Sequence, residues 1–219
     1  MHTYILSFHG VGPALRSMED RECEYWLESD FFEEVLGLVK THPDVGITVD
    51  DGNASDYTHI LPSLLRHGLK ATFFVCSGRL DQPSFLSRSQ VLEIQAAGMT
   101  IGSHGVSHRC WRHLPEAELR HELQTSRNDI ESLCGVAVRE AACPFGSYDR
   151  SVLAALRQAG YQRVYTSDGG VSIPGNWLKS RTTVTREMSL ENVRKMLKDG
   201  PGILKQWSIH TKRLCKSLR

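Results

Sequence analysis

The residues of this 219-residue chain best suited to chemistry are two adjacent aspartates and two histidines. Asp50 and Asp51 lie in the segment TVDDG, and His104 and His108 stand four residues apart in SHGVSH. Two imidazoles and one carboxylate can hold a catalytic divalent ion while leaving positions open for water and substrate. Zinc is the first expectation, and cobalt, nickel and iron accept the same donors.

Each pair also has a purely structural explanation. Asp51-Gly52 is a good turn dipeptide, and two histidines four residues apart are often ordinary surface or core residues. Neighbouring residues of a strand point in opposite directions, so Asp50 and Asp51 can serve different purposes. One carboxylate can bind a metal while the other accepts a proton from a water that the metal activates.

The elements that must position these residues alternate along the chain. Short apolar segments indicate strands, and segments of helical periodicity lie between them. The expected strands are 3–8, 46–49, 71–75, 99–102, 138–143, 164–166 and 181–185. The expected helices are 30–41, 56–67, 89–97, 114–134 and 149–160, and Ser189 opens the last one. This alternation predicts a single α/β domain with a mainly parallel sheet.

Unusual polar residues follow the expected strands, at the point where each strand ends. They are His9, Asp50-Asp51, Ser103-His104, Pro144-Phe145-Gly146 and Asp168. In a parallel α/β barrel these positions converge on one rim, where active sites are built. His9 is therefore a candidate proton donor, although it can equally be a polar residue that precedes the turn at Gly10.

Three of these segments resemble the motifs of the polysaccharide deacetylase family, also called the NodB-homology domain or carbohydrate esterase family 4. They are Thr48–Gly52, Ser103–His108 and Ala142–Gly146, and the similarity spans about residues 45–185. The resemblance implies a distorted parallel (β/α) barrel and removal of an acetyl group from an N-acetylated sugar. It implies Asp50 as the catalytic base, and Asp51, His104 and His108 as metal ligands. It also implies that Pro144, Phe145 and Gly146 line the substrate groove, with the Phe145 amide helping to hold the oxyanion.

Two of the family's motifs are altered in this chain. Ala142 stands where the family has an arginine that braces the catalytic aspartate, and we expect Arg181 to take that place. Asp168 and Trp177 are loose matches to a fourth, substrate-binding motif. Their alternative explanations are a loop residue and a packing residue.

The family's last motif, a C-terminal Leu-x-His strand that carries the catalytic acid, has no clear counterpart here. The N-terminal segment that ends in His9 has the required character. Some members of the family are circularly permuted so that this motif comes first. We therefore expect His9 to be the acid, and we expect His210 to be a surface residue.

Bulk properties limit the partners. The formal net charge of +1 and 23% charged residues give no bias toward nucleic acid. The start of the chain lacks the features of a signal peptide, which favours the cytoplasm. We expect a deacetylase domain over residues 1–200 and a basic tail over 201–219. The tail is either a solvated helix or a contact with the anionic inner face of a membrane.

The expected substrate is an acetamido sugar in a glycan or glycolipid precursor, as in exopolysaccharide metabolism. Two alternatives stay open. The first is an allantoinase-like hydrolase, or another hydrolase of a non-sugar amide, on the same fold. The second is a non-catalytic carbohydrate-binding relative, which would lack metal or base residues.

Overall fold

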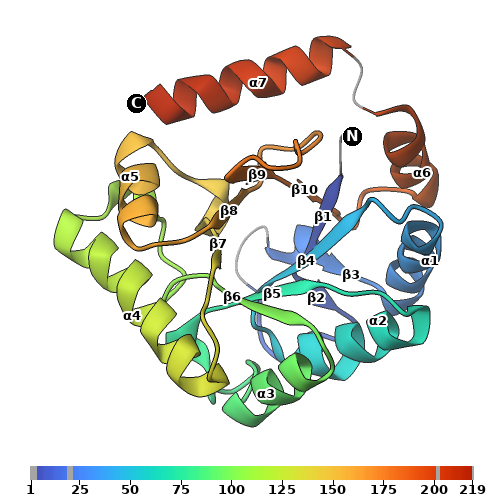
Figure 1. The fold of residues 1–219 in the computed structure, drawn as a ribbon. Coiled ribbons are helices and arrows are strands. Elements are labelled where there is room, and N and C mark those ends of the chain that lie inside the picture. Colours follow the sequence, from blue (N-terminus) through green and yellow to red (C-terminus); the bar gives the residue numbers. More distant parts are fainter. Residues whose placement is uncertain (1–3, 19–21, 201–202, 219) are drawn as a thin grey trace.

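The computed structural model describes residues 4–18, 22–200 and 203–218. Eight strands form one parallel sheet, and helices cover its outer face (Figure 1). The strands lie in the order β10-β1-β4-β5-β6-β7-β8-β9. Their bounds are β1 (Ile5–Phe8), β4 (Gly46–Asp51), β5 (Thr72–Val75), β6 (Thr100–Ser103), β7 (Glu140–Ala142), β8 (Arg163–Thr166), β9 (Leu178–Ser180) and β10 (Thr182–Thr183).

The two edges of this sheet are joined by one short segment. Only Arg181 separates β9 from β10, yet β9 pairs with β8 while β10 pairs with β1. Backbone hydrogen bonds continue across the junction, from Arg181 N to the Thr166 carbonyl (3.0 Å) and from Val184 N to the Ser7 carbonyl (3.0 Å). The sheet is therefore a nearly closed barrel. The predicted α/β barrel in a single domain is confirmed.

Of the seven α-helices in the described residues, six end before residue 200 and connect the strands or follow them. They are α1 (Ser29–Lys40), α2 (Leu61–His67), α3 (Arg88–Ala96), α4 (Glu116–Cys134), α5 (Arg150–Gln158) and α6 (Leu190–Asp199). Side chains that accept backbone N–H groups of the first turn fix three of the helix starts. Ser87 caps α3, Asp149 caps α5 and Ser189 caps α6. Together with the parallel pairing, these helices make the carboxyl ends of the strands meet on one rim.

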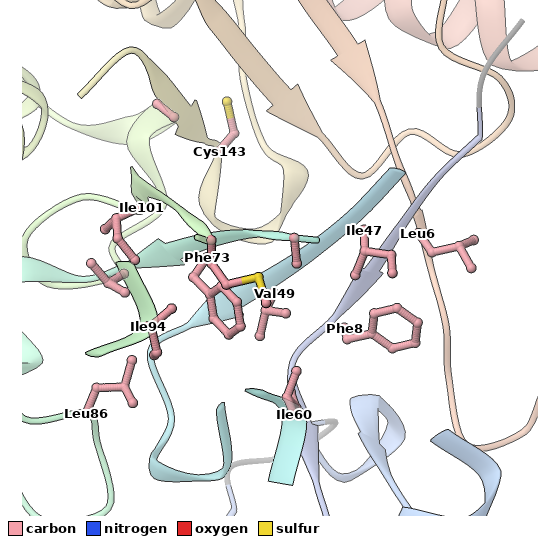
Figure 2. Packing of buried hydrophobic residues seen from close by; sticks show 14 of the residues in the cluster. Leu6, Phe8, Ile47, Val49, Ile60, Phe73, Leu86, Ile94, Ile101 and Cys143 are labelled. Atoms are coloured by element: carbon pink, nitrogen blue, oxygen red, sulfur yellow. The ribbon is translucent and has the colours of Figure 1, made fainter. Parts of the chain in front are cut away.

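The main hydrophobic core lies between the barrel and its helices (Figure 2). Strand alternation divides neighbouring side chains between this core and the barrel interior. Phe73 belongs to the outer core, whereas Phe74 packs against Tyr165 in a separate cluster. Asp50 pairs in register with Phe74, and a side chain on that face points into the barrel. Asp50 is thus placed inside the barrel by its position on β4.

Several local features were not expected from the sequence. After β1 the chain forms a small second sheet of β2 (Gly10–Val11) and β3 (Trp26–Leu27). The expected helix at 56–67 begins with a π-helical turn, Asp56–Ile60. Pro62 stands two residues after this turn, and because proline has no N–H it cannot donate the regular helical bond to the Thr58 carbonyl. Strand β9 was also missed.

Ser189 opens α6 as predicted, but α6 is not the last helix. α7 (Ile203–Leu218) follows it, in the tail for which a solvated helix is one of the two expectations. α7 packs back onto the molecule: Ile209 is buried, and the Arg213 guanidinium donates to the Leu178 carbonyl (3.2 Å). The side chain of His210 lies outside the described residues. Within the described part of the chain, no helix has the length and apolar character that a membrane span requires.

Candidate metal centre and active site

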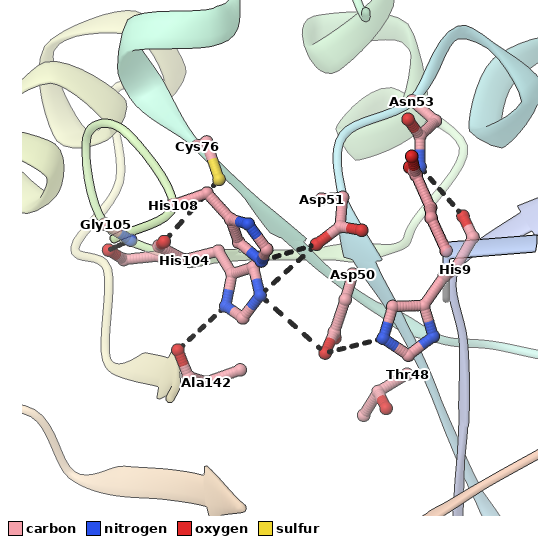
Figure 3. A network of polar contacts seen from close by, with 12 residues as sticks. His9, Thr48, Asp50, Asp51, Asn53, Cys76, His104, Gly105, His108 and Ala142 are labelled. Atoms are coloured by element: carbon pink, nitrogen blue, oxygen red, sulfur yellow. Dashed lines mark hydrogen bonds and ion pairs between the residues drawn. The ribbon is translucent and has the colours of Figure 1, made fainter. Parts of the chain in front are cut away.

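Asp51, His104 and His108 converge at the carboxyl end of the barrel (Figure 3). Asp51 is the last residue of β4, and the histidines belong to the loop that follows β6. The Asp51 Oδ1 atom lies 3.4 Å from His104 Nε2 and 3.1 Å from His108 Nε2. All three candidate ligand atoms lie within 4.8 Å of one another. The sequence prediction named this trio, and the fold brings it together.

The hydrogen bonding of the trio fits a divalent cation. His104 Nδ1 lies 2.8 Å from the Ala142 carbonyl, which can only accept a hydrogen bond, so this nitrogen carries the proton. In a neutral ring, Nε2 then presents its lone pair toward the carboxylate of Asp51. Two acceptors held this close are stabilised by a cation between them. Such an outer hydrogen bond from a histidine ligand is typical of metal sites.

The charge of Asp51 is also favoured. Burial opposes its ionisation, but the nearby His108 and His104 outweigh burial and hold the pKa of Asp51 well below its usual range. A carboxylate that stays ionised inside the protein is a ready ligand for a hard or borderline cation. The donor set therefore fits a divalent metal.

The backbone around the site is held in unusual conformations. Asp51 (φ 81°), His108 (φ 58°) and Phe145 (φ 58°) all lie in the left-handed region that non-glycine residues avoid. Buried Glu122 of α4 secures one of these loops by accepting hydrogen bonds from Val106 N (2.7 Å) and Ser107 N (3.2 Å). Strain of this kind persists only where surrounding contacts impose it, and it is commonly found at functional sites.

Asp50, which precedes the candidate metal ligand Asp51, forms a bidentate ion pair with Arg181. The guanidinium donates to both carboxylate oxygens, with distances of 2.6 and 2.7 Å, and also to the Thr48 hydroxyl at 3.1 Å. Both side chains are buried, at 2% and 0% exposed. Burial raises the pKa of Asp50, but Arg181 and His104 outweigh that effect and the pKa is lowered overall. Asp50 is thus held as a carboxylate.

His9 lies on the side of Asp50 opposite His104 (Figure 3). Its Nε2 atom is 4.0 Å from Asp50 Oδ2, and its ring packs 5.2 Å from that of Tyr25. The His9 carbonyl accepts a hydrogen bond from the Asn53 side chain at 3.2 Å. Burial lowers the pKa of His9, against the opposing attraction of Asp51 and Asp50. The structure therefore places His9 within reach of a group bound beside Asp50.

The segment Pro144–Gly146 borders the metal trio. Pro144 and Gly146 are buried, whereas Phe145 is 67% exposed and its ring centroid lies 4.6 Å from that of His108. An exposed aromatic ring beside a metal ligand offers an apolar surface on which a sugar or acetyl group can rest. This arrangement suits the substrate-facing position expected for these three residues.

The two loosely matched residues have different surroundings. Asp168 follows β8 at the correct rim, but its buried carboxylate is used within the protein, by Tyr148, Thr166 and Lys216. Trp177 precedes β9 at the opposite end of the barrel, where its indole donates to the Tyr161 carbonyl (2.8 Å). Its ring also lies 4.4 Å beneath the Arg157 guanidinium. Trp177 is therefore a packing residue, as its alternative explanation proposed.

Two supporting groups escaped the sequence analysis. The first is the group that orients His104: it is the backbone carbonyl of Ala142, so the residue type at this position does not predict it. Glu122 stands between the buried residues Leu119 and Leu123 of α4. An acidic residue on the apolar face of a helix was a usable signal, because buried carboxylates require partners.

Comparison with known proteins gives the same family as the motifs. The polysaccharide deacetylase family matches residues 39–164, more than half of the chain. A putative polysaccharide deacetylase of Bacillus subtilis, YxkH, is 27% identical over 126 residues, which are 58% of this chain and 45% of that protein. The peptidoglycan-N-acetylglucosamine deacetylase of Bacillus cereus is 30% identical over 105 residues, 47% of this chain and 36% of that protein. The chain thus spans about half or less of the length of these curated relatives.

Solved structures with low sequence identity show the same fold. The Streptococcus pyogenes deacetylase PplD, in complex with acetate, superposes with a TM-score of 0.79 at 20% identity, covering 90% of this chain and 99% of that chain. IcaB from Ammonifex degensii gives a TM-score of 0.76 at 21% identity, covering 90% and 97%. With the family match over residues 39–164 and the Asp51, His104 and His108 trio in place, the chain belongs to the polysaccharide deacetylase family, a family of metal-dependent carbohydrate deacetylases.

Proposed function

We propose that this chain removes the acetyl group from an N-acetylated sugar unit of a glycan, with a divalent ion held by Asp51, His104 and His108. The observation that carries the proposal is that the two adjacent aspartates at the end of β4, Asp50 and Asp51, have different partners. Asp51 faces two imidazole nitrogens, while the adjacent Asp50 is held ionised by Arg181. A ligand and a base on neighbouring residues are what hydrolysis of an amide by activated water requires.

Each residue then has a defined task. A bound divalent ion supplies Lewis acidity, which acidifies water and polarises the acetyl carbonyl. Asp50 Oδ2 accepts the proton of the attacking water, since this oxygen takes one hydrogen bond from Arg181 and the Nε2 atoms of His9 and His104 stand 4.0 Å away, beyond hydrogen-bond distance. His9 donates a proton to the departing amine from the other side of Asp50. Arg181 keeps Asp50 ionised, and the Phe145 amide assists at the developing oxyanion.

Zinc is the metal we propose, because two imidazoles and one carboxylate are a common catalytic zinc set. The sugar we propose is N-acetylglucosamine. The Bacillus cereus relative is named for peptidoglycan N-acetylglucosamine, and a Rhizobium leguminosarum relative, 26% identical over 126 residues, is named a chitooligosaccharide deacetylase. An exopolysaccharide or glycolipid precursor as substrate, a cytoplasmic location and a circularly permuted ancestry stay predictions. So does membrane contact through residues 201–219, where Arg213 and Lys216 bond to the protein itself.

The test is acetate release from N-acetylglucosamine oligomers by the zinc-loaded chain, with allantoin offered as a competing substrate. We expect acetate from the oligomers and no ring opening of allantoin. His104→Ala should lose both bound zinc and activity, whereas His121→Ala, a histidine on the exposed side of α4, should keep both. Ring opening of allantoin without acetate release would favour the cyclic-amide alternative. Oligomer binding without turnover would favour the non-catalytic one.

A further inference from the structure

The C-terminal helix α7 reaches the rim of the active site through one lysine. Lys216 Nζ donates to the Gly146 carbonyl at 3.2 Å and pairs with Asp168 Oδ1 at 2.6 Å. Both contacts lie at the carboxyl end of the barrel, on the side of β7 and β8. α7 itself lies outside residues 39–164, which match the family. The chain thus brings a cation to the rim from a segment that the family match does not include.

Asp168 is the centre of this contact. Its side chain is 3% exposed, and its Oδ2 atom accepts hydrogen bonds from the Tyr148 hydroxyl and the Thr166 hydroxyl, both at 2.8 Å. These neutral donors satisfy one oxygen but leave the negative charge without a counterion. Lys216 supplies that charge, and its ammonium also lies 5.1 Å from the centre of the Tyr148 ring. The Lys216 side chain is itself 38% exposed, so the pair is half-buried, but its removal leaves the buried carboxylate of Asp168 without a paired cation, which is costly.

The turn that Lys216 touches needs such support. Phe145 has a φ of 58°, and Gly146 a φ of 59°. Gly146 is pressed against Ser167, since a Cβ atom added to the glycine would lie 2.8 Å from the Ser167 Cβ. The turn is therefore in contact both with Ser167 and with the Lys216 ammonium. What it presents to solvent is the Phe145 ring, beside the metal ligand His108.

We propose that Lys216 is a positioning residue for deacetylation: through Gly146 and Asp168 it fixes the turn that presents Phe145 to the substrate. This inference rests on the proposed function, because the residue it positions acts in that reaction. Lys216 touches neither the metal trio nor Asp50 in this account, so zinc binding does not depend on it. Its effect is on the geometry of the substrate-facing turn.

The kinetic test compares Lys216→Met with Lys198→Met, which removes an exposed lysine from the neighbouring helix α6. We expect Lys216→Met to lower kcat, by up to about 100-fold if the turn shifts by an ångström. Its zinc content should stay native, and Lys198→Met should retain full kcat. Lys216→Arg keeps a donor and a positive charge and should recover most of the activity. A Lys216→Met enzyme as fast as the control, or an arginine variant as slow as the methionine variant, would overturn the proposal.

A second measurement does not depend on activity. Hydrogen–deuterium exchange of the peptide that contains residues 144–147 should be faster in Lys216→Met than in the native chain and in Lys198→Met. Asp168→Asn, which removes the same ion pair while keeping an acceptor for Tyr148 and Thr166, should speed exchange in the same peptide. Unchanged exchange in both variants would overturn the proposal. A native chain that releases no acetate from any oligomer contradicts the proposed function alone, and the exchange result then still decides the role of Lys216.

Discussion

The barrel contains two buried carboxylates that each pair with an arginine, one at either end. Asp50 lies near the carboxyl end of β4 and is paired with Arg181, whereas Glu140 opens β7 at the amino end and is paired with Arg163. The same pair of chemical groups is thus used twice in one fold. The difference between the two surroundings separates a structural ion pair from the pair to which we assign a catalytic role.

At the amino end the carboxylate is fully occupied. Glu140 accepts hydrogen bonds from Arg163 on one oxygen, and from the Tyr165 hydroxyl (2.9 Å) and the Thr72 hydroxyl (3.3 Å) on the other. The Arg163 side chain is 51% exposed, so this pair reaches water. All acceptor positions of this carboxylate are filled by protein donors, so it joins strands at the amino end of the barrel and has no position left for a substrate.

At the carboxyl end the carboxylate keeps a free side. Arg181 occupies one position on each oxygen of Asp50, and the Nε2 atoms of His9 and His104 stand 4.0 Å from Oδ2. The next residue, Asp51, has a strained backbone and faces the histidines. An ionised carboxylate with room beside it can take a proton. Both carboxylates are buried and both pair with an arginine. What distinguishes Asp50 is that some of its hydrogen-bond acceptor positions are unfilled, and this marks the end of the barrel where we propose catalysis.

The largest effect that this comparison predicts is the loss of the base. Asp50→Asn should lower kcat for acetate release by about 10²- to 10⁴-fold, the range typical of removing a general base. Zinc content should stay native, because Asp51 and the histidines remain. Parallel assays of acetate and bound zinc check this. A rate within a few fold of the native value would show that Asp50 is as structural as Glu140.

The second-largest effect on kcat is expected from the loss of Arg181. Arg181→Ala removes the group that outweighs burial in lowering the pKa of Asp50, so that pKa should rise. Because Asp50 must be ionised to accept a proton, the acid limb of the pH–rate profile should move to higher pH, with kcat lowered at every acidic pH. Arg181→Lys should move the limb less. Profiles that superpose on the native one would contradict the role given to Arg181.

The matched change at the amino end should affect stability and leave the chemistry intact. Glu140→Gln exchanges a charged acceptor for a neutral amide in a buried network, which should lower the free energy of unfolding by about 1–3 kcal/mol. The kcat of the folded, zinc-loaded variant should be native. Denaturant unfolding followed by circular dichroism measures the first quantity, and the acetate assay measures the second. A strong loss of kcat here would break the distinction between the two ends.

The smallest effect expected is that of Thr72→Val. Its hydrogen bond to Glu140 is long at 3.3 Å, and Tyr165 donates to the same oxygen. Removing the hydroxyl should therefore destabilise the protein by less than about 1 kcal/mol, without altering the acetate assay. A loss as large as that of Glu140→Gln would mean that the amino-end network depends on its weakest donor.

The sequence was sufficient to predict the barrel and the metal trio, because both follow from short segments that can be recognised one at a time. Strand ends followed by polar residues mark the rim, and parallel topology brings those ends together whatever the connecting helices are. Asp50, Asp51, His104 and His108 come from two such ends. Arg181 was also expected beside Asp50, because Ala142 stands where the family has the arginine that braces the catalytic aspartate.

Features that depend on three-dimensional packing could not be predicted in the same way. The sequence places Glu122 in a helix, but its role in holding the loop at Val106 and Ser107 depends on how that loop folds against the helix. Trp177 has the residue type of a substrate platform, but the direction of β9 places it at the far end of the barrel. The charges of residues 201–219 predict a basic tail, either a solvated helix or a contact with a membrane. Two of those charges, on Arg213 and Lys216, bond to the protein instead.

The central claim is that Asp51, His104 and His108 hold a divalent ion on which acetate release depends. Titration of zinc into the chelator-treated native chain, with acetate release from an N-acetylglucosamine oligomer measured at each addition, tests it most directly. We predict no activity without metal and a rise that saturates near one equivalent of zinc. Full acetate release by the metal-free chain, or a rate that zinc does not change, would contradict the account.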